Sequence, residues 1–134
     1  MSLRSLPLIV LAFILYNAIV LVFGVEVLDK NLFEIPMLSG GVWKFNWGHL
    51  IILATLFLLF IELVKSTYTN TSSLVDHGLS MVVFIACLIE FLMTPQAASS
   101  VFFLIVVATA IDVVAGFTIG IRVAQRDLTF GTSN

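Results

Sequence analysis

The chain has 134 residues, of which 60% are hydrophobic and only 10% charged, and its formal net charge is −2. A soluble domain carries roughly 25% charged residues, so this chain has too little charge to coat a water-exposed surface. We therefore expect lipid to surround it. No basic patch is present for nucleic acid, which is not expected as a partner. The length fits one domain, residues 1–134.

The first apolar stretch covers residues 6–24. Arg4 precedes it, as a basic residue does in a signal peptide, but the stretch is longer than the ~7–15 apolar residues of a signal-peptide core. No A-x-A-like cleavage site follows it. We therefore predict an uncleaved first membrane helix. Asn17 lies near its middle, where we expect a hydrogen bond to a neighbouring helix.

The outer loop, residues 25–47, has the pattern of a β-hairpin. Hydrophobic and polar residues alternate over 33–37 and again over 43–47, which is the period of a strand. Ser39, Gly40 and Gly41 supply turn residues between the two runs. We predict two short paired strands, and the alternative is an irregular or part-helical loop.

The same loop is expected to lie on the membrane surface with its aromatic side towards lipid. Trp43 and Trp47 are the predicted interface anchors, because amphipathic rings prefer the headgroup level. Pro36 has no N–H to donate, so it must lie at an edge or a bulge of the hairpin.

Three more apolar stretches follow, over residues 48–65, 74–94 and 97–122. Each approaches or exceeds the ~20 residues needed to cross the hydrocarbon core. Ser73 and Asp76 form a capping-box pattern at the start of the third. Because the links are short, we expect helices two, three and four to run antiparallel as neighbours. The predicted fold is an all-α membrane protein, an antiparallel four-helix transmembrane bundle with a short interfacial β-hairpin.

The basic residues near the helix ends predict the orientation, since cytoplasmic loops carry an excess of Lys and Arg. With the N-terminus inside, four basic residues fall inside and two outside: Arg4, Lys65, Arg122 and Arg126 against Lys30 and Lys44. We therefore expect both termini in the cytoplasm.

Asp112 lies near the middle of the fourth apolar stretch. An isolated charge at that depth is penalised by at least a few kcal/mol, so we predict that Asp112 faces the bundle or a subunit interface and is protonated near neutral pH. Its expected partner is Asn17 or a polar group of the third helix. Ala108 shares its side, and Gly116 with Gly120 forms a G-x-x-x-G pair, which is typical of close helix packing.

A stripe of polar and small residues follows one face of the third helix at about 100° per residue. Its members are Asp76, Ser80, Cys87, Glu90 and Thr94. The stripe is either a packing face, which we favour, or a pathway for protons or ions, and Glu90 is the member that packing explains least. On the second helix, Glu62 precedes Lys65 by three residues, which suggests a snorkelling Glu–Lys pair at the inner end.

The two histidines, His49 and His77, are expected at opposite membrane faces, so they cannot share a haem or a metal ion. Cys87 is the single cysteine, which excludes an intrachain disulfide. No Ser/His/Asp or Cys/His arrangement can be assembled at one depth. We therefore expect no cofactor, no metal site and no enzymatic activity.

Three segments, residues 48–62, 75–80 and 111–117, resemble a group of small uncharacterised four-helix inner-membrane proteins of bacteria. They include Gly48-His49, the run Asp76-His77-Gly78, and Asp112. The resemblance covers most of the chain. It implies a bacterial inner membrane and carries no activity with it.

The leading expectation for function is an accessory or scaffold subunit that packs against membrane partners. The alternative is a small homo-oligomeric proton- or ion-coupled transporter or channel that uses Asp112 and Glu90. A third hypothesis is a haem- or quinone-binding membrane subunit that uses His49 or His77. The expected partners are the lipid bilayer and either another membrane protein or a second copy of the chain.

Overall fold

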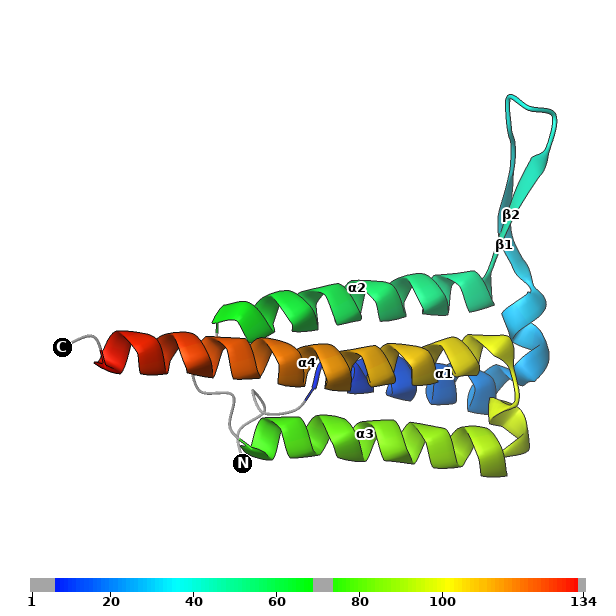
Figure 1. Ribbon diagram of the computed structural model, residues 1–134. Helices are drawn as coiled ribbons and strands as arrows, with labels where there is room; N and C mark the ends of the chain where they lie inside the picture. The colour runs from blue at the N-terminus through cyan, green and yellow to red at the C-terminus, as the bar shows by residue number, and fades with distance from the viewer. Residues whose placement is uncertain (1–6, 69–73, 133–134) are drawn as a thin grey trace.

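A computed structural model of the chain describes residues 7–68 and 74–132; the side chains of residues 68, 74–77, 120, 123–124 and 126–132 are outside the description. Within these ranges four helices lie side by side, with a two-stranded sheet at one end (Figure 1). The helices are α1 (Val10–Phe23), α2 (Trp47–Tyr68), α3 (Leu74–Met93) and α4 (Ser100–Thr132). Short 3-10 helices η2 (Val25–Asp29) and η3 (Pro95–Ala97) lie in two of the links.

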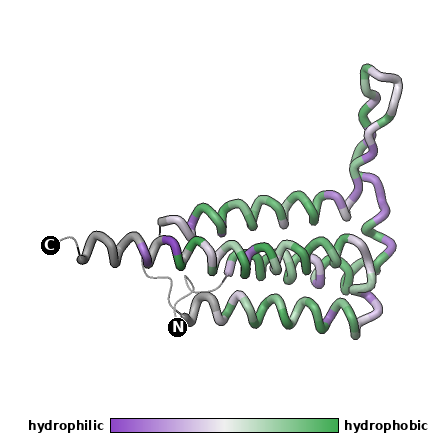
Figure 2. The backbone as a smooth tube through the Cα atoms, in the orientation of Figure 1, coloured by the Kyte–Doolittle hydropathy of each residue, from purple (hydrophilic) through white to green (hydrophobic). Residues whose placement is uncertain are grey.

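Two of the helices are long and apolar enough to cross a membrane, over Trp47–Thr67 and Ser100–Ile119. Figure 2 shows hydrophobic residues along most of the helical layer. The apolar helices Val10–Phe23 and Gly78–Met93 are shorter, so the four membrane-spanning helices expected from the sequence are not shown. The apolar stretch counted from the sequence includes residues before the first helical turn. α1 then ends at Gly24, where φ is +88° and the chain turns into η2.

α4 occupies the middle of the bundle, between α2 and α3 (Figure 1). The expectation that α2 and α3 pack as direct neighbours is therefore wrong. Buried residues on α4 include Phe102, Ile105, Ala108 and Val113. They cover a broad part of its circumference, so this helix can pack on more than one side. Successive helices still alternate in direction, which makes α2 and α4 parallel.

α4 starts three residues later and ends ten residues later than its predicted range of 97–122. At its start the Ser99 Oγ accepts a hydrogen bond from the Phe102 N–H at 3.2 Å, a helix-capping contact. At its other end no proline interrupts the polar residues that follow Arg122. The apolar pattern therefore stops before the helix does.

The predicted hairpin is confirmed. Strands β1 (Asn31–Pro36) and β2 (Val42–Asn46) pair antiparallel, with Phe33 opposite Phe45, and Pro36 lies at the strand end. The turn uses Gly40 at φ +93°, a conformation that favours glycine. The hairpin projects from the bundle transverse to the helices (Figure 1).

An aromatic core joins the helices near the hairpin end. Phe102 of α4 is fully buried and its ring lies 4.9 Å from that of Tyr16, 6.2 Å from Phe13 and 6.3 Å from Phe91, measured between centroids. These contacts tie α1, α3 and α4 together. Gly48 permits a close approach beside this core, because a Cβ there would lie 2.9 Å from a methyl group of Val101.

Candidate functional site

Asp112 faces the interior of the bundle, as predicted, and is only 4% exposed. It forms a side-chain hydrogen bond with Ser80 of α3. Its Oδ2 atom has no hydrogen-bond partner among the described residues. Of the two expected partners, the third helix is confirmed and Asn17 is wrong. The Asn17 side-chain amide donates instead to the Phe13 carbonyl of its own helix at 2.9 Å.

Glu62 of α2 connects to the start of α1. Its Oε2 accepts a hydrogen bond from the Leu8 backbone N–H at 2.9 Å. Leu8 lies just before the first turn of α1, where N–H groups have no partner within the helix and the helix dipole is positive. The Glu62–Lys65 pair predicted from the sequence stays a prediction, and the Leu8 contact is additional to it. Local spacing cannot reveal a contact between residues 54 positions apart.

Polar groups of α2, α3 and α4 lie at the same level of the bundle as the start of α1. Ile9, Leu59 and Ala108 form a small buried cluster. Glu62 and Asp112 follow Leu59 and Ala108 by three and four residues, and these offsets keep each carboxyl group on the same helix face as the cluster residue. Leu8 directly precedes Ile9 in the chain. Glu62 and Asp112 interact electrostatically. We call Asp112, Glu62, Ser80 and the Leu8 N–H the inner carboxyl site.

A second carboxyl group lies nearer the hairpin end. The Glu90 Oε2 atom is buried and has no hydrogen-bond partner in the described part of the chain. Glu90 interacts electrostatically with Cys87, which is fully buried, and with Tyr16. The Tyr16 hydroxyl donates to the Gln96 carbonyl and bonds to Ser99, both at 2.7 Å.

The polar stripe predicted on α3 therefore turns towards protein at Ser80, Cys87 and Glu90. The side chain of Asp76, and with it the predicted capping box, lies outside the described residues. Among the described residues, Glu90 on α3 and Asp112 on α4 each have a buried carboxyl oxygen without a partner. Such atoms are rare in folded proteins, so Glu90 remains the member of the stripe that packing explains least.

His49 has a structural role at the start of α2. Its backbone N–H donates to the Asn46 Oδ1 at 2.8 Å, and its Nδ1 accepts from the Asn46 N–H at 3.2 Å. This reciprocal pairing resembles a capping box. His77 falls outside the described side chains. Within the described residues, no three His, Cys, Asp or Glu side chains could hold a metal ion.

The other residues predicted from the sequence lie on α4, on the hairpin and at the start of α2. Ala108 and Gly116 are buried on α4, as close helix packing requires, while Gly120 is outside the described side chains. Trp43 is 46% exposed on the hairpin, where its ring contacts Phe33 and Phe45. Trp47 differs, since it begins α2 and packs against the buried core.

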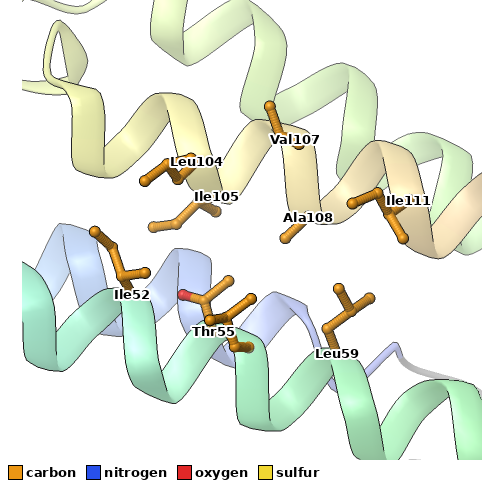
Figure 3. A pocket seen from close by; sticks show the side chains of 9 residues that line it. Ile52, Thr55, Leu59, Leu104, Ile105, Val107, Ala108 and Ile111 are labelled. Carbon is orange, nitrogen blue, oxygen red and sulfur yellow. The ribbon is translucent and has the colours of Figure 1, made fainter.

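An apolar groove runs between α2 and α4, with a volume of about 180 Å³ (Figure 3). Ile52 and Leu59 line it from α2, and Leu104, Ala108 and Ile111 line it from α4. Thr55 is its polar member, and the Thr55 hydroxyl donates to the Ile51 carbonyl within its own helix. The groove therefore offers an apolar surface alone.

Comparisons of the chain with known protein families, with curated proteins and with solved structures found no match. The resemblance to small bacterial inner-membrane proteins is therefore a prediction. Within the described residues, the geometry by itself defines a helical chain with two helices that could span a membrane, and with two unpaired carboxyl oxygens inside its bundle.

Proposed function

We propose that this chain is a multi-pass protein of a bacterial inner membrane that crosses the bilayer four times. α2 and α4 are long enough, and α1 and α3 lie alongside them in the bundle (Figure 1). α3 has 20 residues, about 30 Å at 1.5 Å per residue, which matches the hydrocarbon core. α1 gains a further turn from the hydrogen bond between the Val10 N–H and the Pro7 carbonyl, 3.1 Å long.

Both termini are proposed to be cytoplasmic. Lys30 and Lys44 lie at the hairpin end of the bundle, and Lys65 and Arg122 lie towards the opposite ends of α2 and α4. A single cysteine placed at Gly40 on a Cys87→Ala background tests this orientation. A membrane-impermeant thiol reagent should label it from the periplasmic side. Labelling from the cytoplasmic side alone would overturn the assignment.

The role that we propose is that of a non-enzymatic accessory or scaffold subunit. The observation that supports this role is the apolar outer surface of α2 and α4, which is recessed at the groove between them. Large side chains on α2 beside it are exposed, among them Leu56 (55%) and Phe57 (66%). An apolar recess allows a partner helix to approach closely, and close packing is what drives helix association in lipid.

A matched pair of variants tests this role. Leu56 lines the groove and Leu53 does not, although both lie on α2 and are similarly exposed. Leu56→Trp should reduce the recovery of a co-purifying membrane protein in mild detergent, whereas Leu53→Trp should not. Mass spectrometry identifies the partner. Equal recovery with both variants, or no partner for the wild-type chain, would contradict the scaffold role.

The unpaired oxygens of Asp112 and Glu90 favour a second candidate, a homo-oligomeric proton- or ion-coupled transporter or channel. Such a protein needs water to reach its intramembrane acids. Asp112→Cys on the Cys87→Ala background should react with a small water-soluble thiol reagent if this candidate holds. A chain that stays unlabelled and monomeric would exclude it. His49 is explained by its capping contacts, so we do not propose the haem-binding role.

A further inference from the structure

We propose that the inner carboxyl site binds a single proton, with Asp112 as the neutral acid and Glu62 as the anion. The inference concerns the state of the site in any membrane role of the chain. It deepens the transport candidate but does not depend on transport. It assigns different protonation states to two carboxyl groups that lie near each other on parallel helices.

The first step is that two negative charges are not stable together here. Asp112 interacts electrostatically with Glu62, and the two side chains extend from faces that pack around Ile9, Leu59 and Ala108. Two carboxylates that share an apolar site cannot both ionise readily, so one of them keeps a proton.

The second step assigns the charge to Glu62. Its Oε2 accepts the Leu8 N–H at the start of α1. The N-terminus of a helix stabilises an anion through its free N–H groups and its dipole. Glu62 is also only partly buried, so its carboxylate loses less hydration than that of Asp112 would.

The third step assigns the proton to Asp112. This side chain is only 4% exposed, has Ser80 as its hydrogen-bond partner, and leaves Oδ2 without a partner. Isolated ionised carboxylates are strongly disfavoured in such surroundings. Two carboxyl groups with such different surroundings take different protonation states, as they do in many acid–base pairs.

The groups that face Asp112 support a proton as the ligand. α2 presents Glu62, α3 presents Ser80, and α1 presents the Leu8 N–H that Glu62 occupies. The side chains at residues 74–77 of α3 are outside the description. In the described residues no set of three metal-ligating side chains is present. A metal cation would require more oxygen ligands than this pair supplies.

Infrared difference spectroscopy of the full chain in lipid nanodiscs at pH 7 tests the assignment. The difference between wild type and Asp112→Asn should contain the carbonyl band of a protonated carboxylic acid. The difference between wild type and Glu62→Gln should instead contain the bands of an ionised carboxylate. Glu90→Gln is the matched control, because it removes the other carboxyl group that has a buried oxygen without a partner and should leave the Asp112 band in place.

Ser80→Ala provides a second readout. It removes the hydrogen bond to Asp112, so the Asp112 carbonyl band should shift in frequency, whereas Ser100→Ala at the exposed start of α4 should not shift it. This measurement keeps the proposal testable if Asp112→Asn does not fold. An ionised Asp112 at pH 7, a protonated Glu62, or an Asp112 band unmoved by Ser80→Ala would each overturn it. Since none of these readouts involves a partner protein, failure of the scaffold role would leave them unchanged.

Discussion

The two ends of the bundle are built in different ways. At the hairpin end, the aromatic core packs four rings together and the Tyr16 hydroxyl has two partners. At the other end, the inner carboxyl site leaves an oxygen of Asp112 without a partner. Nearer the hairpin end the Glu90 Oε2 atom also lacks a partner, so the two ends differ in their aromatic packing and not in whether an unpaired oxygen is present.

This difference suggests a division of roles along the bundle. A buried polar atom without a partner weakens a structure, so the fold must be held by other contacts. The aromatic core supplies them, because Phe102 joins helices that are distant in sequence. The inner carboxyl site can then contain an acidic group that contributes to function and not to stability.

The largest expected effect is on the aromatic core. Phe102→Ala should reduce the free energy of unfolding by about 3 kcal/mol, at the low end of values for buried Phe, because it empties space among Tyr16, Phe13 and Phe91. Reversible unfolding by SDS in mixed micelles measures it. Phe57→Ala, at 66% exposure on α2, should change stability by less than about 0.5 kcal/mol. Equal losses would contradict the role given to Phe102.

Tyr16→Phe should have a smaller effect, about 1 kcal/mol. It keeps the ring but removes the hydroxyl that contacts the Gln96 carbonyl and Ser99. A double-mutant cycle with Ser99→Ala, measured by the same unfolding method, isolates the pair from the capping contact that Ser99 makes with Phe102. Strict additivity of the two variants would mean that the hydroxyl contact does not contribute.

The sequence predicted the local features of the fold well. Period-two alternation around Gly40 predicted the hairpin, because register and turn chemistry are local. The cost of a buried charge predicted that Asp112 faces protein. Both follow from a few neighbouring residues and the solvent that surrounds them.

The sequence was weaker wherever two distant segments had to be matched. It placed Asn17 beside Asp112, but the Asn17 amide is satisfied one turn back along α1. It placed α2 next to α3, because short links favour neighbours, and could not foresee that the broad buried surface of α4 fits between them. The Glu62 contact with Leu8 also joins distant segments, so the sequence named Glu62 as a candidate but did not predict its link to α1 or its place beside Asp112.

Loss of the Glu62 side chain tests whether the inner end holds α1. Glu62→Ala should weaken the first turn of α1 by about 0.5–1 kcal/mol, the usual range for a charge at a helix terminus. Amide hydrogen exchange should therefore become roughly two- to fivefold faster at residues 8–12. Exchange in the aromatic core should not change. Glu34→Ala on the exposed hairpin is the control, and equal acceleration there would show that the effect is not specific to Glu62.

The smallest expected effect on stability is that of Asp112→Asn. If Asp112 is a neutral acid, Asn offers a similar shape and hydrogen-bonding capacity, so the free energy of unfolding should change by less than about 0.5 kcal/mol. An ionised Asp112 would behave differently, because removing an isolated buried charge would stabilise the bundle measurably. SDS unfolding of the two chains at pH 7 distinguishes these outcomes. If the scaffold role holds, the variant should also keep the partner protein, whereas a proton-coupled transporter would fold normally and lose its activity. Asp112→Asn, the variant expected to change stability least, therefore best distinguishes a purely structural role of Asp112 from a functional one.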